Sequence, residues 1–318
     1  MKKKQLMNTN LQYFARPVFD PDTTTMQDAK TGSIPKNISD AIITDAKHGS
    51  AIMKLAKAVP MTKPEEEFTY MTGIGAYWVD EAERIQTSKP SFVKAKMRAH
   101  KMAVIIPTTK ENLKHSISNF FELMKPEILE AFHKQFDVAT FSGVNSPFSW
   151  NILKSATDSS QLVGESTNKY DDFNKAMGMI EDHDMDANAI ATIRSQKQVY
   201  RGTKDKNDMP IFNTPGAGAP DEVLGLPLAY THKGAFGNNS IKELVGNWDQ
   251  AYYGILDGVE YEILTEATLT TVEDQDGKPL NLAERDMVAL KATFSPAFMI
   301  VKDEAFAAIK PAAEVPEA

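Results

Sequence analysis

The chain has 318 residues and contains no cysteine. Without thiols it can build neither a disulfide scaffold nor a thiolate metal site, and it offers no cysteine nucleophile. No apolar run approaches the roughly 20 residues that a membrane helix needs. The basic start at Lys2 to Lys4 is followed by polar residues instead of the apolar stretch of a secretory signal. These absences predict a protein that folds in a reducing cytosol and does not span a membrane.

An excess of positive charge is also missing. The 35 Lys and Arg residues are outnumbered by 43 Asp and Glu residues, which gives a formal net charge of -8 and a pI near 5.4. A chain that grips nucleic acid through its phosphates needs the opposite balance. The hydrophobic content of 42% and the charged content of 25% are ordinary for a soluble globular protein, and the length suffices for one or two cores.

Motifs that carry catalysis or hold a cofactor are absent as well. Gly73-Ile74-Gly75 lacks the third glycine of a dinucleotide site, and the run from Gly216 to Ala219 lacks the Lys-Ser/Thr pair of a phosphate loop. No Gly-x-Ser-x-Gly nucleophile elbow occurs. Glu130 and His133 could supply two metal ligands from one helix face, but a second such pair is missing, which favours a solvated face. We therefore expect no enzyme, no cofactor and no metal site.

The strongest positive feature is a division of charge between residues 65 and 101. The first arm, from Glu65 to Glu83, contains no Lys or Arg, and the second arm, from Arg84 to Lys101, contains no Asp or Glu. In the second arm basic residues alternate with apolar ones, which is the two-residue period of a strand. The alternating residues are Lys94, Lys96, Arg98 and His100 against Val93, Ala95, Met97 and Ala99. The pattern predicts a long β-hairpin with one basic face.

Two functions fit such a ribbon. Basic residues beside Phe92 could bind single-stranded nucleic acid by charge and base stacking. The acidic arm is covalently adjacent, however, and would repel a phosphate backbone, so a protein–protein contact is the favoured interpretation. Exposed ion pairs are weak and screened by salt, so they would set the register of this contact while aromatic and aliphatic side chains supply the burial.

A long helix is predicted after the hairpin. Apolar residues recur along it at three- and four-residue steps: Phe120, Phe121, Met124, Ile128, Ala131, Phe132, Phe136 and Ala139. Pro126 lies inside this stripe and predicts a kink, and Gly143 followed by Pro147 predicts the end of the helix. Ahead of the helix, Thr108 and Glu111 have the spacing of a capping box.

The other segments predict an α+β chain without internal repeats. Residues 1–36 are typical of an extended arm that orders against a partner, and a helix is expected from Ser39 until Pro60 ends it. Further helices are expected at 171–182, 194–201 and 303–309. Strands are expected at 187–193, 251–256, 259–264, 287–294 and 298–301, with a hairpin turn at Asp257-Gly258. His183, Asp184 and Asp186 are typical of a turn with caps.

This order of elements resembles the major capsid proteins of tailed bacteriophages with the Hong Kong 97 fold. The likeness is greatest to capsid subunits of temperate phages of Gram-positive bacteria. The residues that carry it are Gly75-Ala76-Tyr77-Trp78-Val79, Thr87-Ser88-Lys89, the run from Val104 to Glu111, the Phe120 to Phe136 helix and Asp286-Met287-Val288-Ala289-Leu290.

The resemblance implies an α+β, Hong Kong 97-type capsid fold with an N-terminal arm, an extended E-loop hairpin, a peripheral (P) domain with a long spine helix, and an axial (A) domain. The implied segments are the arm at 1–36, the start of the P domain at 37–64, the E-loop at 65–106, the spine helix at 107–148, the A domain at 149–285, and a P-domain return strand with a tail at 286–318. The implied intersubunit E-loop residues are Glu81, Glu83, Arg84, Lys89, Lys94, Lys96 and Arg98.

The implied function is that of a major capsid protein that self-assembles into hexamers and pentamers of an icosahedral shell enclosing double-stranded DNA. Because the chain lacks the long N-terminal scaffold region of some relatives, a separate scaffolding protein is expected, together with a portal protein, a maturation protease and indirect contact with DNA. The expected location is the virion capsid, assembled in the host bacterial cytoplasm. The alternative is an intracellular enzyme or nucleic-acid-binding module with an unrecognised site.

The segment from Asn10 to Ala15 resembles the Leu-Asn-Leu-Gln-Phe-Phe-Ala processing motif of this group, with Thr9 in place of the first Leu and Tyr13 in place of a Phe. The resemblance implies cleavage around Phe14 and Ala15, which would remove a leader of residues 1–14. On its residues alone, the segment would equally serve as a hydrophobic staple that fixes the arm to the body. Lys–Asn crosslinks occur in some relatives, but no motif singles out a lysine of this hairpin, and crosslinking is not predicted.

Overall fold

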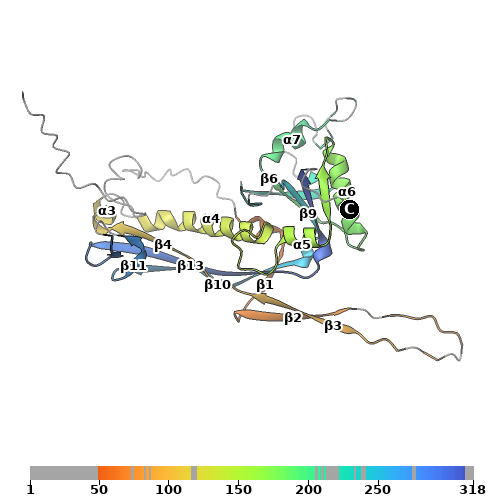
Figure 1. The fold of residues 1–318 in the computed structure, drawn as a ribbon, viewed down its shortest axis with the longest axis horizontal. Helices are drawn as coiled ribbons and strands as arrows, with labels where there is room; N and C mark the ends of the chain where they lie inside the picture. Colours follow the sequence, from red (N-terminus) through yellow and green to blue (C-terminus); the bar gives the residue numbers. More distant parts are fainter. Residues whose placement is uncertain are drawn as a thin grey trace, which may run out of the picture. The chain divides into compact units, whose positions relative to one another are not determined.

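The computed structural model describes residues 49–72, 75–81, 84–85, 87–115, 120–204, 207, 209, 211–212, 222–232, 234–237, 241–273 and 277–311. The chain divides into two compact units. The first includes Ala103–Lys125 and Tyr261–Ala292, and the second includes Asp45–Met102, Pro126–Glu260 and Thr293–Ala318. Three long elements, labelled in Figure 1, contain residues of both units: helix α4 (Phe120–Phe141), strand β10 (Ala251–Leu264) and strand β13 (Met287–Ile300).

The long strands belong to a four-stranded sheet with the order β1-β10-β13-β4. Its edge strands are β1 (Lys57–Pro60) and β4 (Met102–Thr109). β1 pairs in parallel with β10, with Lys57 opposite Tyr252 and Pro60 opposite Ile255. β13 is buried along its length except at the half-buried Lys291, and it is a central strand of this sheet, between β10 and β4.

The second unit contains a six-stranded sheet with the order β5-β14-β9-β6-β8-β7. Its strands are β5 (Leu162–Glu165), β14 (Phe306–Pro311), β9 (Glu243–Gly246), β6 (Ala189–Ile193), β8 (Leu226–Thr231) and β7 (Glu222–Val223). Helices α5 (Ile152–Asp158) and α6 (Lys169–Glu181) pack on β14, and α7 (Gln196–Gly202) packs on β6. The helix expected at 171–182, the strand at 187–193 and the helix at 194–201 are confirmed as α6, β6 and α7, each within two or three residues at either end.

Aromatic rings form the centre of this unit. Trp248, in a 3-10 turn (Trp248–Gln250), is almost fully buried between Phe141 and Phe306, with ring centroids 6.0 and 5.3 Å away. Its indole N–H donates to the Ala189 carbonyl at 2.9 Å, so the polar end of the ring is also satisfied. The last turn of α4 and the start of β14 are thereby held in one core.

The region before the hairpin differs from the expected helix. Residues 39–48 lie outside the described residues, and the helix that is described, α2 (Ala51–Leu55), has Ser50 as its N-cap and ends well before Pro60. Ala56 is already extended, and β1 follows at once. The prediction was wrong here because β1 gains ladder hydrogen bonds to β10, which a continued helix would forgo.

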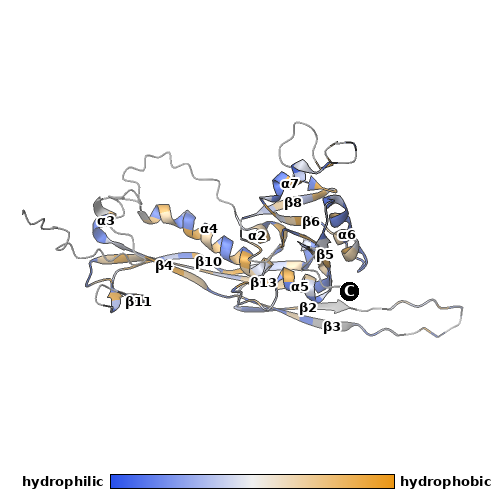
Figure 2. Ribbon diagram, turned by 45° about the horizontal axis from the view of Figure 1, so that its top comes forward, coloured by the Kyte–Doolittle hydropathy of each residue, from blue (hydrophilic) through white to orange (hydrophobic). Residues whose placement is uncertain are grey.

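The long helix is confirmed as α4, with 22 residues and Pro126 inside it. Ile128, Phe132, Phe136 and Ala139 are buried as expected, and α4 shows blue and orange stretches along its length (Figure 2). Ala131 was assigned to the apolar stripe but is exposed, whereas Asp137 is buried. Gly143 has a φ of +72°, the left-handed conformation that ends helices.

The first unit is built from smaller elements. β11 (Thr268–Glu273) pairs antiparallel with β12 (Pro279–Asn281), and both pack into an apolar cluster of Leu269, Leu280, Leu282, Met287 and Ala289. α3 (Lys110–His115) begins after β4, where the Thr109 hydroxyl accepts the Asn112 backbone N–H at 3.2 Å. The expected cap Thr108 instead accepts the Asn112 side-chain N–H, so the cap lies one residue later than predicted.

Three segments differ from the expected turns, breaks or helix and contain more strand than predicted. Asp257-Gly258 makes no hairpin turn, because β10 runs through it, and Ser295-Pro296 does not divide β13. The helix expected at 303–309 is a 3-10 turn (Asp303–Ala305) followed by β14. In each case pairing with strands distant in the sequence overrides the local turn or helix signal.

Candidate assembly interface

The charged segment contains an antiparallel hairpin of β2 (Glu65–Thr72) and β3 (Ser91–Arg98). Its ladder runs from Glu65 opposite Arg98 to Thr72 opposite Ser91. The expected hairpin is confirmed there, but the ladder is shorter than the charged arms, and the described part of the connection between these strands contains no strand. We call the described residues 75–81, 84–85 and 87–92 the hairpin tip.

The two charged arms pair with each other inside one chain. Lys96 Nζ lies 2.7 Å from a Glu67 carboxylate oxygen and 3.3 Å from one of Glu65, and Lys94 Nζ lies 3.8 Å from Glu67. The hydrogen bond and charge of Lys96 lower the pKa of Glu67, and Glu67 followed by Glu65 raises the pKa of Lys96. We call these four residues the charge ladder.

The opposite face of the hairpin base is apolar. Met97 is 0% exposed, and it packs with Met61, Ala297 and Met299. The half-buried side chains of Phe68, Ala95 and Ala99 join this cluster. The two-residue alternation predicted for β3 is therefore confirmed, because Lys94, Lys96 and Arg98 are exposed while Met97 is buried.

The hairpin tip exposes a concentration of large apolar side chains. Trp78 is fully exposed, and Ile85 and Phe92 are 76% and 62% exposed; the complete set is Tyr77, Trp78, Val79, Ile85 and Phe92. The Gly75 N–H donates a hydrogen bond across the tip to the Ser88 hydroxyl at 2.8 Å. Clustered apolar side chains that water surrounds mark sites of protein association.

The sequence-predicted interface residues fall into three groups. Glu81, Arg84 and Lys89 are exposed in the tip. Lys94, Lys96 and Arg98 are exposed on β3, where Lys94 and Lys96 belong to the charge ladder. Glu83 and the expected processing residues Phe14 and Ala15 lie outside the described residues.

Sequence reasoning gave too little weight to the apolar tip. It used Tyr77-Trp78-Val79 only as part of the family resemblance and Phe92 only as a neighbour of the basic face. The available signal was a set of bulky apolar residues in a polar segment without helical or strand periodicity. Apolar residues in such a segment do not form one face that could pack into a core. The cross-strand ion pairs were also foreseeable, since a hairpin places residues of opposite arms side by side.

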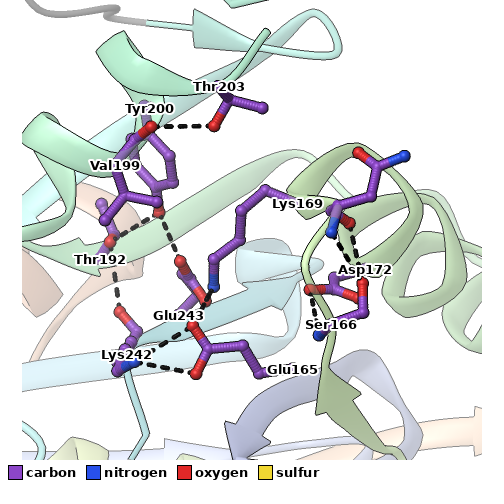
Figure 3. Close-up of polar contacts among 11 residues, drawn as sticks. Glu165, Ser166, Lys169, Asp172, Thr192, Val199, Tyr200, Thr203, Lys242 and Glu243 are labelled. Carbon is purple, nitrogen blue, oxygen red and sulfur yellow. Dashed lines mark hydrogen bonds and ion pairs between the residues drawn. The ribbon is translucent and has the colours of Figure 1, made fainter. Parts of the chain in front are cut away.

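A second polar cluster, which the sequence did not reveal, lies in the six-stranded sheet and its helices (Figure 3). Lys169 Nζ, at the start of α6, lies 2.8 Å from Glu165 and 3.0 Å from the fully buried Glu243. Glu243 also accepts the Tyr200 hydroxyl at 3.0 Å, and Lys242 Nζ lies 2.8 Å from Glu165. The cluster therefore ties α6 and α7 to β5 and β9.

Burial and pairing oppose each other in this cluster. Burial raises the pKa of Glu243, and Lys169 acts against that rise. Burial alone would lower the pKa of Lys169, but Glu243 and Glu165 outweigh it, so that pKa is raised. Burial and the Glu243 charge raise the pKa of the Tyr200 hydroxyl. The arrangement keeps Lys169 charged and serves as a structural clamp.

Glu130 and His133, which were considered as metal ligands, are both half-buried on α4. Glu130 pairs with Lys134 at 2.5 Å, and burial lowers the pKa of His133. The turn predicted after α6 is confirmed, with the His183 N–H bonded to the Ile180 carbonyl and Asp184 at a φ of 57°. Over the described part of the chain, no three His, Asp or Glu side chains are grouped to hold a metal ion, and no helix is long and apolar enough to cross a membrane.

Comparison with known proteins identifies the fold. Residues 31–310 match the Phage capsid family. The chain is 36% identical over 320 residues to the "Major capsid protein" of Staphylococcus phage 80alpha, covering 98% of this chain and 97% of that one. A solved chain from Microbacterium phage Oxtober96 is 26% identical, with a TM-score of 0.76 over 90% of this chain and 98% of its own. A structure titled "Capsid of empty GTA particle computed with C5 symmetry" is 13% identical with a TM-score of 0.63 over 90% of this chain, and shows likeness of fold alone.

The family match covers most of the chain, and the relatives are matched over nearly their full lengths. The α+β architecture with a long helix, a long hairpin, and a four-stranded and a six-stranded sheet is the Hong Kong 97-type capsid fold that the sequence resembled. The chain therefore belongs to the phage capsid family and is a shell-forming subunit of a phage head.

Proposed function

We propose that the hairpin tip is the part of this capsid subunit that binds a neighbouring copy during shell assembly. The observation that carries the proposal is the full exposure of Trp78 among five exposed large apolar side chains in one short segment. An aromatic side chain can bury about 150–250 Å² on association, so Trp78 with Tyr77 and Phe92 offers the contact area of a hot spot.

In this proposal the charge ladder stabilises the hairpin, and the basic face does not make the main contact with the neighbouring subunit. Lys94 and Lys96 already face Glu65 and Glu67 at 2.7 to 3.8 Å, so their charges are largely compensated before a neighbour arrives. The Met97 cluster holds the base of the hairpin on the second unit. A braced base and an apolar tip together suit an arm that reaches another subunit.

The proposed assembly is an icosahedral shell of hexamers and pentamers around double-stranded DNA. Each copy would both extend a tip and receive one, and contacts of this head-to-tail kind close into rings. Individually weak contacts suffice because each subunit makes several at once. The segments 65–106, 107–148 and 149–285 would serve as E-loop, spine region and A domain, with 37–64 and 286–318 completing the P domain.

Further partners are proposed from the family resemblance. They are a scaffolding protein, a portal protein and a maturation protease that would cut around Phe14 and Ala15, with assembly in the host cytoplasm. The intersubunit roles of Glu81, Glu83, Arg84 and Lys89 are part of the same proposal, since three of them lie in the exposed tip. Mass spectrometry of mature particles tests the cleavage: an intact Met1 contradicts it.

The tip contact is tested by Trp78→Ala, with Trp150→Ala as the matched control. Trp150 is also a partly exposed tryptophan, at 39%, but it lies outside the hairpin. Each variant is expressed alone and with the phage's scaffolding protein, and particles are separated from free subunits by sedimentation. We expect Trp78→Ala to keep the Tm of the free subunit and to form few or no shells, while Trp150→Ala assembles. Shells at wild-type yield from Trp78→Ala would overturn the proposal.

A further inference from the structure

The carboxylate of Asp137, in the last part of α4, binds the first described helix of the chain. Its Oδ1 accepts the Ser50 hydroxyl at 2.5 Å, and its Oδ2 accepts the Ala51 N–H at 2.9 Å. The Ile52 N–H lies 3.4 Å from Oδ1. Asp137 is 2% exposed, so these donors hold a charge that water does not reach.

The helix that Asp137 binds cannot stand alone. α2 has five residues, and a helix this short does not pay back its nucleation cost in water. Its first three backbone N–H groups are satisfied from outside the helix, two by Asp137 and the Met53 N–H by Ser50 Oγ at 3.2 Å. α2 therefore depends on this one carboxylate and on the burial of Ile52.

The contact between Asp137 and the start of α2 lies where the described part of the chain begins. Gly49 is exposed and Ser50 is 2% exposed, so the chain enters the packed body within one residue. The preceding 48 residues, which include the polar arm, are attached at this point. The first described residues of the chain are therefore held in place where Ser50 and Ala51 meet Asp137.

We infer that Asp137 is a positioning residue that latches the root of the N-terminal arm to α4 and so directs the arm to its contacts during shell assembly. The inference rests on the proposed assembly function. Release of α2 would leave Asp137 as a buried carboxylate without its three donors, which is costly, so the contact favours the bound position.

Other titratable groups face this carboxylate. His232 Nδ1, from the end of β8, lies 3.7 Å from Asp137 Oδ2, and His133 lies one turn earlier on α4, where the Asp137 charge acts on its pKa. All variants are therefore compared at one and the same pH.

The test compares Asp137→Asn with Asp172→Asn in the free full-length subunit. Asp172 is also fully buried and accepts a backbone N–H, from Ser166, but it belongs to α6. By hydrogen exchange we expect the amides of Ala51, Ile52 and Met53 to lose protection about tenfold or more in Asp137→Asn. Protection of β13 and β14 should be retained, and Asp172→Asn should leave α2 as in the wild type.

Unchanged protection of α2 in Asp137→Asn would overturn the latch, and so would an equal loss of protection across the whole second unit. Assembly is then measured with the same variants. Wild-type shell yield from an Asp137→Asn subunit whose α2 has opened would overturn its role in directing the arm. A wild-type chain that never assembles would instead contradict the assembly function and leave the exchange result standing.

Discussion

The two faces of β3 should separate stability from assembly, which makes Met97→Ala and Phe92→Ala a decisive pair. Met97 is 0% exposed among Met61, Ala297 and Met299, whereas Phe92 is 62% exposed on the same strand. Truncating a buried methionine to alanine costs about 2–5 kcal/mol. In a cooperative unit of about 150–250 residues each kcal/mol lowers the Tm by about 2–4 °C, so Met97→Ala should lower it by roughly 4–20 °C.

Phe92→Ala should leave the Tm within about 1–2 °C of the wild type, because an exposed side chain has little packing to lose. It should nevertheless reduce shell yield, since Phe92 belongs to the hairpin tip. Differential scanning calorimetry of free subunits and sedimentation of assembly reactions measure the two effects. The reasoning fails if Met97→Ala leaves the Tm unchanged, or if Phe92→Ala lowers the Tm as much as Met97→Ala does.

Two further predictions concern the charged clusters. In the charge ladder, the double variant Lys94→Glu with Lys96→Glu should loosen the hairpin, because it places four carboxylates together. Adding Glu65→Lys and Glu67→Lys should make the hairpin stable again, with the signs of the charges reversed. Hydrogen exchange of β2 and β3 measures the stability of the hairpin in both variants. If the quadruple variant also assembles with the wild-type shell yield, the charge ladder serves only to stabilise the hairpin. If its hairpin is stable but it does not assemble, the basic face belongs to the interface. In the buried cluster, Glu243→Gln should destabilise by about 3 kcal/mol or more, because Lys169 keeps its charge with one partner fewer. The double variant Glu243→Leu with Lys169→Met should lower the free energy of unfolding, measured by denaturant titration, less than Glu243→Gln does. An equal or greater loss would contradict the conclusion that the pairing of Lys169 with Glu243 offsets the cost of burying both charges.

Features set by local pattern could be predicted from the sequence. α4 follows from its apolar stripe and from Gly143, and β3 follows from strict alternation, because both depend on residues close together in the chain. The resemblance extended this to the fold class, since it drew on the order of all elements. Boundaries at Asp257-Gly258 and Ser295-Pro296 were wrong because the partner strands that hold β10 and β13 extended are distant in sequence.

The polar contacts could not be derived in the same way. Asp137 meets Ser50 across 87 positions, and Lys169 meets Glu243 across 74. The local sequence does not show which carboxylate will be buried. The free-energy cost of burying a carboxylate is offset only by hydrogen-bond donors that folding brings close from distant parts of the chain. The tip residues were visible in the sequence, but their exposure depended on the ladder ending at Thr72.

The place of β14 in the six-stranded sheet has a consequence for synthesis on the ribosome. β14 lies between β5 and β9, and it is the only neighbour of β5 among the described strands of that sheet. A nascent chain that stops anywhere before Phe306 therefore leaves β5 unpaired and exposes the sheet along an open edge. Prematurely terminated chains would lack the finished unit on which neighbouring copies depend. The late strand thus allows only chains translated at least through β14 to contribute a complete subunit to the particle.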